Sequence, residues 1–367
     1  HCSGGNVAHG TRVAKSVGFG SGSGRAAVGA LRPSRGLGLR CRSETEAAST
    51  SRPFGQQAAE QSSNGFNSKD YEAEAIQVLE GLEPVRKRPG MYIGSTGRKG
   101  LHHLLYEVLD NSIDEVQTGH ATEIRVEVAK KSGFVKISDD GRGIPVDVHP
   151  ATGKTALETV LTVLHAGGKF GAENSAYTTT GGLHGVGLSV VNALSEHLDV
   201  SVRRQGKVYR QEYARGSPLT EVTEAAAGRK APRSGTTVRF KPDAEIFTGG
   251  IGMEISVINA RLKELSFLNP GVTIFFRYAD EEEGLETAEW EKHSHKGGLL
   301  EYVETKTKGN KNMHAPFLVS KLVDGIYVEI ALQWSADLFS DTIVSYVNNV
   351  KTVDGGTHVE GLKSALT

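Results

Sequence analysis

The stretch Asp139-Asp-Gly-Arg-Gly-Ile-Pro145 decides the fold, together with Glu107-Val-Leu-Asp-Asn111 before it and Gly181-Gly-Leu-His-Gly-Val-Gly187 after it. The earliest of the three supplies a carboxylate and a carboxamide one helical turn apart. The middle one places an acid at the end of a strand, directly before glycines. The last is a glycine loop that leads into an apolar helix. These parts can serve as a base, a metal ligand, a purine reader and a phosphate cradle, so they predict a nucleotide pocket without a P-loop lysine.

Hydrophobic spacing places these stretches on helices and at strand ends. Apolar residues recur at helical spacing from Leu101 to Ile113 and predict a helix that carries the earliest stretch. Alternating apolar residues at 124–128 and 135–137, joined by a turn at 130–133, predict a hairpin that ends at the middle stretch. The same patterns predict helices at 188–198 and 254–267 and strands at 198–203, 207–213, 236–240 and 272–276. Helices gathered against a mostly antiparallel sheet make an α+β sandwich, not a doubly wound fold.

The chain divides into three parts on composition and pattern. Residues 1–68 lack hydrophobic periodicity and are predicted to be disordered. Residues 69–294 are predicted to form the sandwich together with an N-terminal arm. The acidic, glycine-containing stretch 279–298 marks a boundary, and residues 295–367 are predicted to begin a second α+β domain.

The first 43 residues have the composition of a targeting leader. They contain no Asp or Glu, carry arginines and one lysine, and are rich in Gly, Ser and Ala. An arginine-rich, serine-rich and acid-poor start is typical of an organellar transit peptide. An ordinary disordered tail is the alternative interpretation.

Bulk composition limits the remaining possibilities. No stretch approaches the roughly 20 apolar residues of a membrane span, so no membrane partner is predicted. Both cysteines, Cys2 and Cys41, lie in the leader, which excludes a disulfide framework or a cysteine metal site from the predicted domains. Of the 42 basic and 43 acidic residues, 8 basic and 3 acidic ones lie in residues 1–68, so the rest has a net charge of −6. A mildly acidic domain is not by itself a surface that grips DNA.

The three stretches resemble a known family when two further runs are added. With Val85-Arg-Lys-Arg-Pro-Gly-Met-Tyr-Ile-Gly94 and His165-Ala-Gly-Gly-Lys-Phe170, they resemble the ATPase subunit of bacterial-type DNA gyrase, from about Tyr71 to the end of the chain. The wider group that includes Hsp90, MutL and histidine kinases would match only the short acid-Asn, Asp-x-Gly-x-Gly and glycine-loop pieces. The run Glu264-Leu-Ser-Phe-Leu-Asn-Pro-Gly271 favours gyrase over its sister, the topoisomerase IV ATPase subunit.

This resemblance implies a GHKL-type sandwich followed by the start of a transducer domain. It implies ATP and Mg²⁺ as ligands, and a homodimer that forms when ATP binds. It implies DNA and the gyrase A subunit as partners, DNA mainly through the complete holoenzyme. Because a bacterial-type enzyme follows the leader, a plastid or mitochondrial location is expected.

His103, Glu107 and Asn111 are each four residues apart and so form one polar stripe on the predicted helix. Glu107 can accept a proton from an attacking water, Asn111 can offer a neutral oxygen to Mg²⁺, and His103 can orient the Glu107 carboxylate. The resemblance assigns them as general base, magnesium ligand and aligning partner. A solvated helix face is the alternative for an isolated Glu-x-x-x-Asn.

Asp139 is chosen over Asp140 as the purine reader. Alternation from Val135 and Ile137 turns Asp139 toward the interior and Asp140 away from it. A buried carboxylate that accepts from the adenine amino group would explain purine choice. A surface turn is the alternative, and Arg142 is expected to pair with an acid such as Glu115.

The same resemblance selects Asp139 and adds further contacts to ATP. It places Thr236 on the adenine, and Gly143 and Ile144 are further contacts to ATP. The glycine loop gives backbone amides access to phosphates at a helix N-terminus. The resemblance places the loop backbone and Lys169 on the phosphates, with Tyr177 between them. It also implies that Tyr71, on the arm, touches the nucleotide of the partner subunit. The loop residues concerned are Leu183, His184, Gly185, Val186 and Gly187.

The function implied is that of an ATP-hydrolysing region of a type II DNA topoisomerase, in which ATP-driven dimerisation drives strand passage and supercoiling. A topoisomerase IV-type subunit and a nucleotide-dependent dimerisation module with little turnover are the alternatives. The resemblance also implies that the chain stops at Thr367 inside the second domain. The family's later lysine to the γ-phosphate and its metal-binding domain for DNA cleavage would then be absent, and weak activity is expected of this chain alone.

Overall fold

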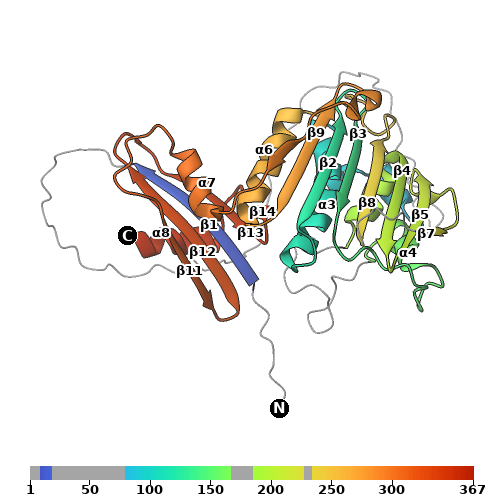
Figure 1. Cartoon of the computed structure of the whole chain (residues 1–367), viewed down its shortest axis with the longest axis horizontal. Helices are drawn as coiled ribbons and strands as arrows, with labels where there is room; N and C mark the ends of the chain where they lie inside the picture. The colour runs from blue at the N-terminus through green and yellow to red at the C-terminus, as the bar shows by residue number, and fades with distance from the viewer. Residues whose placement is uncertain (1–8, 19–78, 167–184, 227–233) are drawn as a thin grey trace, which may run out of the picture. The chain divides into compact units, whose positions relative to one another are not determined.

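The computed structural model describes residues 9–18, 79–166, 185–226 and 234–367 (Figure 1). Its large sheet has the strand order β10-β9-β2-β3-β8-β4-β5-β6, and β7 pairs with β5. All its pairs are antiparallel except β2 with β9. The strands are β2 Glu123–Ala129, β3 Phe134–Asp139, β4 Ser195–Arg204, β5 Lys207–Ala214, β6 Ser217–Pro218, β7 Thr223–Ala226, β8 Gly235–Pro242, β9 Thr273–Ala279 and β10 Glu291–His293.

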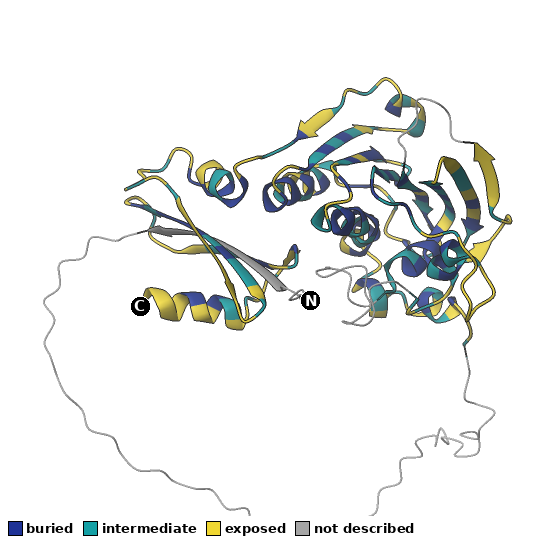
Figure 2. Cartoon of the chain, turned by 60° about the horizontal axis from the view of Figure 1, so that its bottom comes forward, coloured by how far each residue is buried: buried dark blue, intermediate teal, exposed yellow. Residues whose placement is uncertain are grey.

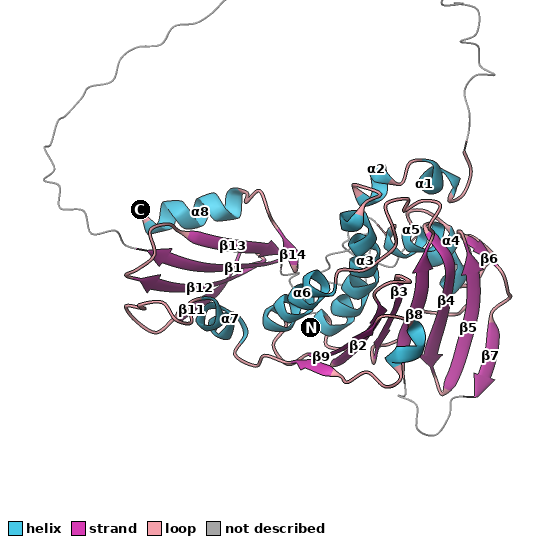
Figure 3. Cartoon of the chain, turned by 90° about the horizontal axis from the view of Figure 1, so that it is seen from above, coloured by secondary structure: helices cyan, strands magenta, loops and turns pink. Residues whose placement is uncertain are grey.

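Helices cover one face of this sheet, as Figure 3 shows. The apolar stripe predicted on the first helix is buried there: Leu101, Leu104, Leu105 and Leu109 have no exposed surface. They pack against the inward residues of β2 and β3 in one continuous core. The predicted α+β sandwich is therefore confirmed. The helices are α1 Glu83–Lys87, α2 Gly90–Ile93, α3 Arg98–Gln117, α4 Ala156–Thr162, α5 Gly187–Ala193 and α6 Ile255–Leu268, with a 3-10 turn η2 Glu282–Leu285.

The helix predicted at 188–198 is shorter than expected. α5 ends at Ala193, and Leu198 lies in β4. The reason is strand pairing, because β4 already pairs with β8 at Ser195, opposite Pro242. Apolar residues at 194 and 198 fit helical spacing and strand spacing equally well, so the local pattern could not place the boundary.

A second, smaller sheet contains the C-terminal residues and has the order β11-β12-β1-β13-β14. Its strands are β1 His9–Gly18, β11 Phe317–Val323, β12 Ile326–Ser335, β13 Thr342–Val347 and β14 Val350–Lys351, with helices α7 Gly298–Lys306 and α8 Thr357–Leu366. Phe267 and Leu268 of α6 share a buried cluster with residues of α7, β12 and β13. Along the chain, β10 is the last strand of the large sheet, and α7 begins at residue 298. Apart from β1, the elements of the smaller sheet and its helices therefore start within the predicted boundary stretch 279–298.

The prediction that residues 1–68 are disordered is wrong for residues 9–18. They form β1, which pairs in parallel with β12 and antiparallel with β13. Strand pairing uses backbone groups that nearly every residue carries, so hydrophobic periodicity is not needed for a strand between two others. The rest of the leader lies outside the described residues.

Burial, by which Figure 2 colours the chain, follows the expected alternation in β3. In β3, Val135, Ile137 and Asp139 are buried while Lys136 and Ser138 are partly exposed. The last buried residue of this strand is therefore an acid, at the edge of the core. No helix in the described ranges is long and apolar enough to cross a membrane.

Candidate nucleotide site

The polar stripe predicted on α3 is formed. Nε2 of His103 lies 3.0 Å from Oε1 of Glu107. Nδ2 of Asn111 donates to the backbone oxygen of Glu107 at 2.8 Å, which fixes the orientation of its carboxamide. The hydrogen bond to Glu107 raises the pKa of His103, against the opposing effect of burial. His103 is therefore charged over a wider pH range than a free histidine.

The end of the glycine loop lies directly against this stripe. α5 begins at Gly187, where a Cβ atom would lie only 2.3 Å from Oε2 of Glu107. Gly185, two residues earlier, has a φ of 59°, in the left-handed region that favours glycine. The glycines thus bring the start of α5 and its backbone amides to the carboxylate. Val186 lies between them, before the first turn of the helix.

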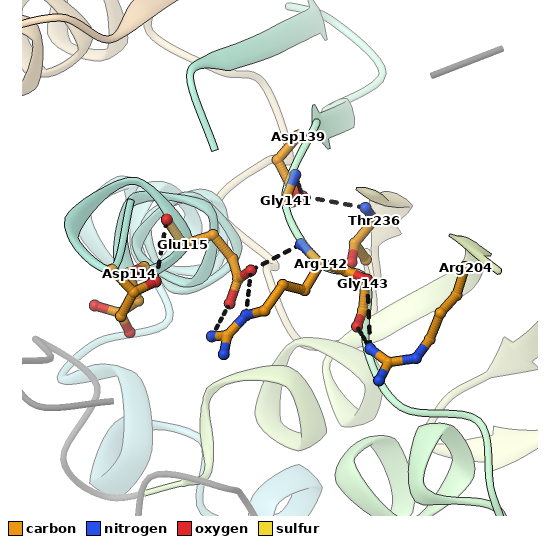
Figure 4. Close-up of polar contacts among 9 residues, drawn as sticks. Asp114, Glu115, Asp139, Gly141, Arg142, Gly143, Arg204 and Thr236 are labelled. Carbon is orange, nitrogen blue, oxygen red and sulfur yellow. Dashed lines mark hydrogen bonds and ion pairs between the residues drawn. The ribbon is translucent and has the colours of Figure 1, made fainter. Parts of the chain in front are cut away.

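Asp139 is buried, and its carboxylate accepts hydrogen bonds from three different segments. The backbone N–H groups of Gly141 and Thr236 donate to Oδ1 at 3.0 and 3.1 Å. The hydroxyl of Ser112, on α3, donates to Oδ2 at 3.1 Å. Figure 4 shows the two backbone contacts where β3, β8 and the following loop meet. Burial raises the pKa of Asp139, and the hydrogen bonds oppose that rise.

Asp140 points away from this place, as the strand alternation predicts. Its Oδ1 accepts from the backbone N–H groups of Thr122 and Glu123, at 2.8 and 2.9 Å, and its Oδ2 accepts from the Thr122 hydroxyl. Asp140 therefore caps the start of β2. The two neighbouring acids have separate tasks, and only Asp139 faces the site.

Close backbone packing surrounds Asp139. A Cβ atom at Gly141 would lie 2.9 Å from the Glu115 side chain, and one at Gly143 would lie 2.8 Å from the backbone oxygen of Arg203. At Gly235 it would lie 2.1 Å from the backbone oxygen of Asp139. Gly143 and Gly235 also have positive φ angles, 77° and 138°. The glycines of Asp-x-Gly-x-Gly are needed here for space as well as for backbone conformation.

The predicted ion pair between Arg142 and Glu115 is confirmed. Nη2 and Nε of Arg142 donate to the two carboxylate oxygens at 2.7 and 3.1 Å, and the backbone N–H of Arg142 adds a third bond at 2.9 Å (Figure 4). The pair ties the loop after β3 to the last turns of α3. Ile144, which is also predicted to contact ATP, is partly buried and packs against the core.

Two residues that hold this site together were not predicted from the sequence. Ser112 donates to Asp139, and a signal existed, since it directly follows Asn111 on the same helix. Arg204 at the end of β4 donates to the backbone oxygens of Gly143 and Arg142 at 3.0 and 3.4 Å. Its contact is long-range, and no local pattern indicated it. Five predicted residues lie outside the described residues: Tyr71, Lys169, Tyr177, Leu183 and His184.

The donor set suits Mg²⁺ bound mainly through phosphates. Among the described residues there is no group of three or more His, Cys, Asp or Glu that could hold a metal. Mg²⁺ prefers oxygen ligands, keeps several waters and commonly uses one or two protein ligands with substrate phosphates. Nδ2 of Asn111 donates to the helix backbone, and the other end of the carboxamide is a neutral oxygen, the kind of ligand that Mg²⁺ prefers. The residues therefore fit a magnesium ion held with a nucleotide.

A separate hollow of about 610 Å³ opens on the other side of the large sheet, and no residue of the α3 stripe lines it. Its charges are mixed and largely paired, as for Glu127 with Lys136 and Arg277. A salt-bridged hollow with open sides is a weaker nucleotide site than the convergence of glycine loop, carboxylates and carboxamide at α3. We therefore place the candidate site at α3.

Comparisons with known proteins identify the family of this chain. Residues 96–246 match the family described as histidine kinase-, DNA gyrase B-, and HSP90-like ATPase, and residues 298–367 match DNA gyrase B. The crystal structure of the 43K ATPase domain of Thermus thermophilus gyrase B, in complex with an aminocoumarin, is 35% identical, with a TM-score of 0.62. The match covers 77% of this chain and 70% of that one. The chain belongs to the DNA gyrase B family.

Gyrase B proteins of organelles and bacteria share a higher sequence identity with this chain than that solved structure does. The mitochondrial DNA gyrase B protein of Arabidopsis thaliana is 51% identical over 311 residues, which is 84% of this chain and 42% of the relative. The DNA gyrase B protein of Synechocystis is 52% identical over 301 residues, which is 81% of this chain and 27% of the relative. The chain thus spans less than half the length of these gyrase B relatives.

Proposed function

We propose that this chain binds ATP with Mg²⁺ and hydrolyses it as the ATPase region of a DNA gyrase B protein. The main support for this proposal is the hydrogen bonding of the Asp139 carboxylate. A carboxylate has about four acceptor directions, and three donors of the described residues use three of them. Among the described residues no fourth donor meets this carboxylate, and the adenine amino group is a donor that could use the remaining direction.

The α3 stripe supports a hydrolytic step. Glu107 accepts a proton from a water molecule as the water oxygen forms a bond to the γ-phosphorus. The bond between that phosphorus and the β–γ bridging oxygen breaks, and ADP leaves with the electron pair. His103, 3.0 Å from Glu107, holds the carboxylate in place. Asn111 would hold Mg²⁺ with the phosphates, and that ion neutralises phosphate charge when bound.

The remaining contacts of the nucleotide rest on the resemblance. We assign the phosphates to the backbone of residues 183–187 and to Lys169, with Tyr177 beside them. Thr236, Gly143 and Ile144 would lie near the adenine. Tyr71, from the arm, would touch the ribose of a partner subunit, so that ATP closes a homodimer.

At the level of the whole enzyme, we propose a partnership with the gyrase A subunit and with DNA. ATP-driven dimerisation would then drive strand passage and supercoiling. The named relatives are gyrase B proteins, which favours gyrase over a topoisomerase IV-type subunit. A nucleotide-dependent dimerisation module with little turnover remains the second candidate, because a general base and a metal ligand do not by themselves determine the rate of ATP hydrolysis.

Two measurements on the full chain test the proposal. Calorimetry with ATP and with a non-hydrolysable analogue measures binding, and single-turnover phosphate release measures chemistry. Binding and release by the native chain, with binding but no release by Glu107→Gln, is the expected result. Binding without release by the native chain would favour the dimerisation module. Failure of the native chain to bind either nucleotide would overturn the proposal.

We also propose an organellar location. The arginine-rich leader supports it, and relatives from Arabidopsis thaliana and Nicotiana benthamiana are named mitochondrial and chloroplastic/mitochondrial. A fluorescent protein fused after residue 367 should enter plastids or mitochondria of plant cells. The same fusion starting at residue 69 should stay in the cytosol. Cytosolic fluorescence from both fusions would contradict the proposal.

A further inference from the structure

Two consecutive arginines at the end of β4 hold the loop after β3 by its backbone. Side chains alternate along a strand, so Arg203 and Arg204 point to opposite faces of the sheet. Arg204 donates to the backbone oxygen of Gly143 at 3.0 Å. Arg203 donates through Nη2 to the backbone oxygen of Asp139 at 3.3 Å. The segment from 139 to 143 is therefore held from both faces.

Arg203 reaches Asp139 across an intervening strand. β8 lies between β4 and β3, and its residue opposite Arg203 is Gly235. A Cβ atom at Gly235 would lie 3.0 Å from Nη2 of Arg203 and 2.1 Å from the oxygen that it binds. The guanidinium thus crosses β8 where that strand has no side chain. Its Nη1 donates to the hydroxyl of Thr237, two residues along, at 3.4 Å.

The carbonyl that Arg203 binds lies beyond the ladder between β3 and β8. The last pair of that ladder is Ser138 with Thr237, one residue before Asp139. Without Arg203, the Asp139 carbonyl would lose this partner from the β8 side. Nε of Arg203 is buried without an acceptor in the described part of the chain, so the two Nη contacts are what hold this guanidinium.

We propose that Arg203 is a positioning residue for adenine recognition, acting from the sheet face opposite the nucleotide. It fixes the main chain of Asp139, and the carboxylate of the same residue then meets the adenine amino group. This inference rests on the proposed function. Guanine carries an oxygen where adenine carries its amino group, so GTP cannot use this contact. Loosening Asp139 should therefore weaken ATP more than GTP.

The test measures ATP and GTP affinities of the full chain for Arg203→Gln and Arg203→Lys. Arg203→Gln should weaken ATP by about 3- to 10-fold, the range of one ordinary hydrogen bond, and change GTP affinity by less. Arg203→Lys keeps one donor and should recover part of the ATP affinity. The ratio of the two affinities is the readout, because a purely structural loss would lower both together.

Arg210→Gln is the matched control. Arg210 lies on β5, lines the same hollow as Arg203 and undergoes the same change of charge. No side-chain contact to the Asp139 segment is present for it among the described residues. Its ATP to GTP ratio should equal that of the native chain. An equal fall of the ratio in both variants would assign the effect to charge and overturn the proposal.

Failure of this inference can be told from failure of the proposed function. If the native chain prefers ATP and Asp139→Asn removes the preference, the purine reader stands. An unchanged ratio in Arg203→Gln would then refute only the role of Arg203. If the native chain shows no preference for ATP, the purine reader itself is wrong. Thermal unfolding of each variant identifies any that fails to fold, and Arg203→Lys then carries the test.

Discussion

Gly187→Ala should inactivate the chain without unfolding it. The new Cβ would lie 2.3 Å from Oε2 of Glu107, whereas ordinary contact begins near 3.4 Å. The obstacle is the end of a flexible side chain, so the carboxylate moves by about 1 Å and folding is little affected, but a misplacement of that size can cost on the order of 10²-fold in rate. The same movement disturbs the bond between Glu107 and His103.

Folding stability should stay level or rise slightly in this variant. Gly187 is the first residue of α5 and its φ is not positive, so alanine fits the backbone there. Replacing glycine by alanine at a compatible position typically adds about 0.4–1 kcal/mol, because the unfolded chain loses freedom. The expected combination is therefore an unchanged or higher unfolding midpoint with a turnover reduced by about two orders of magnitude.

Single-turnover phosphate release and thermal unfolding measure the two sides of this prediction, and ATP calorimetry measures binding. Gly90→Ala is the control, because Gly90 is also the first residue of a helix and has nothing within 4 Å of its Cβ position. It should leave turnover and binding unchanged. Native turnover in Gly187→Ala would refute the argument that Glu107 needs its present place. A large loss of stability would show that the collision is not relieved by the side chain.

Three further outcomes follow from the same geometry. Glu107→Gln should bind ATP almost normally but lower turnover by about 10²–10⁴, the usual contribution of a general base, and equal losses of binding and turnover would make Glu107 structural. Asp139→Asn should lower ATP affinity by about 10- to 150-fold, and Asp140→Asn should lower it much less, since Asp140 caps β2; calorimetry giving the reverse order contradicts the assignment. Burial lowers the pKa of His102 below its usual 6.5, and the neutral ring accepts a hydrogen bond from the backbone N–H of Glu254. The stability that the neutral ring contributes is therefore full above pH 6.5 and is lost as the pH falls through the lowered pKa of the folded state. Urea unfolding at several pH values should therefore show a weaker loss of stability in acid for His102→Gln than for the native chain, and identical pH dependences would disprove the linkage.

The parts of the site that the sequence predicted are those with a local cause. Helical spacing alone brings His103, Glu107 and Asn111 onto one stripe, because their separation is set by the helix. Strand alternation alone separates Asp139 from Asp140. In both cases the backbone within a few residues determines where the side chain points, so tertiary packing had little to add.

The parts that the sequence did not predict depend on distant strands. Arg204 and Gly235 act on the loop after β3 because β8 and β4 lie beside it, and that order is a property of the whole sheet. β1 pairs with strands more than 300 residues away, through backbone groups that leave no pattern in its sequence. The helix after the glycine loop was overextended because apolar residues at 194 and 198 fit two periods. Each of these features could be predicted only with knowledge of the partner strand.

One rigid helix connects the two ends of the proposed nucleotide. α3 carries Glu107 at the phosphate end, Ser112 at the Asp139 carboxylate and Glu115 at the loop after β3. From Glu107 to Glu115 the helix rises by about 12 Å, at 1.5 Å per residue. Since a buried helix moves as a unit against a close-packed core, the base cannot shift along its axis without also shifting the donor to the purine reader. In the proposed function, purine recognition by Asp139 and positioning of the base Glu107 are therefore linked through α3.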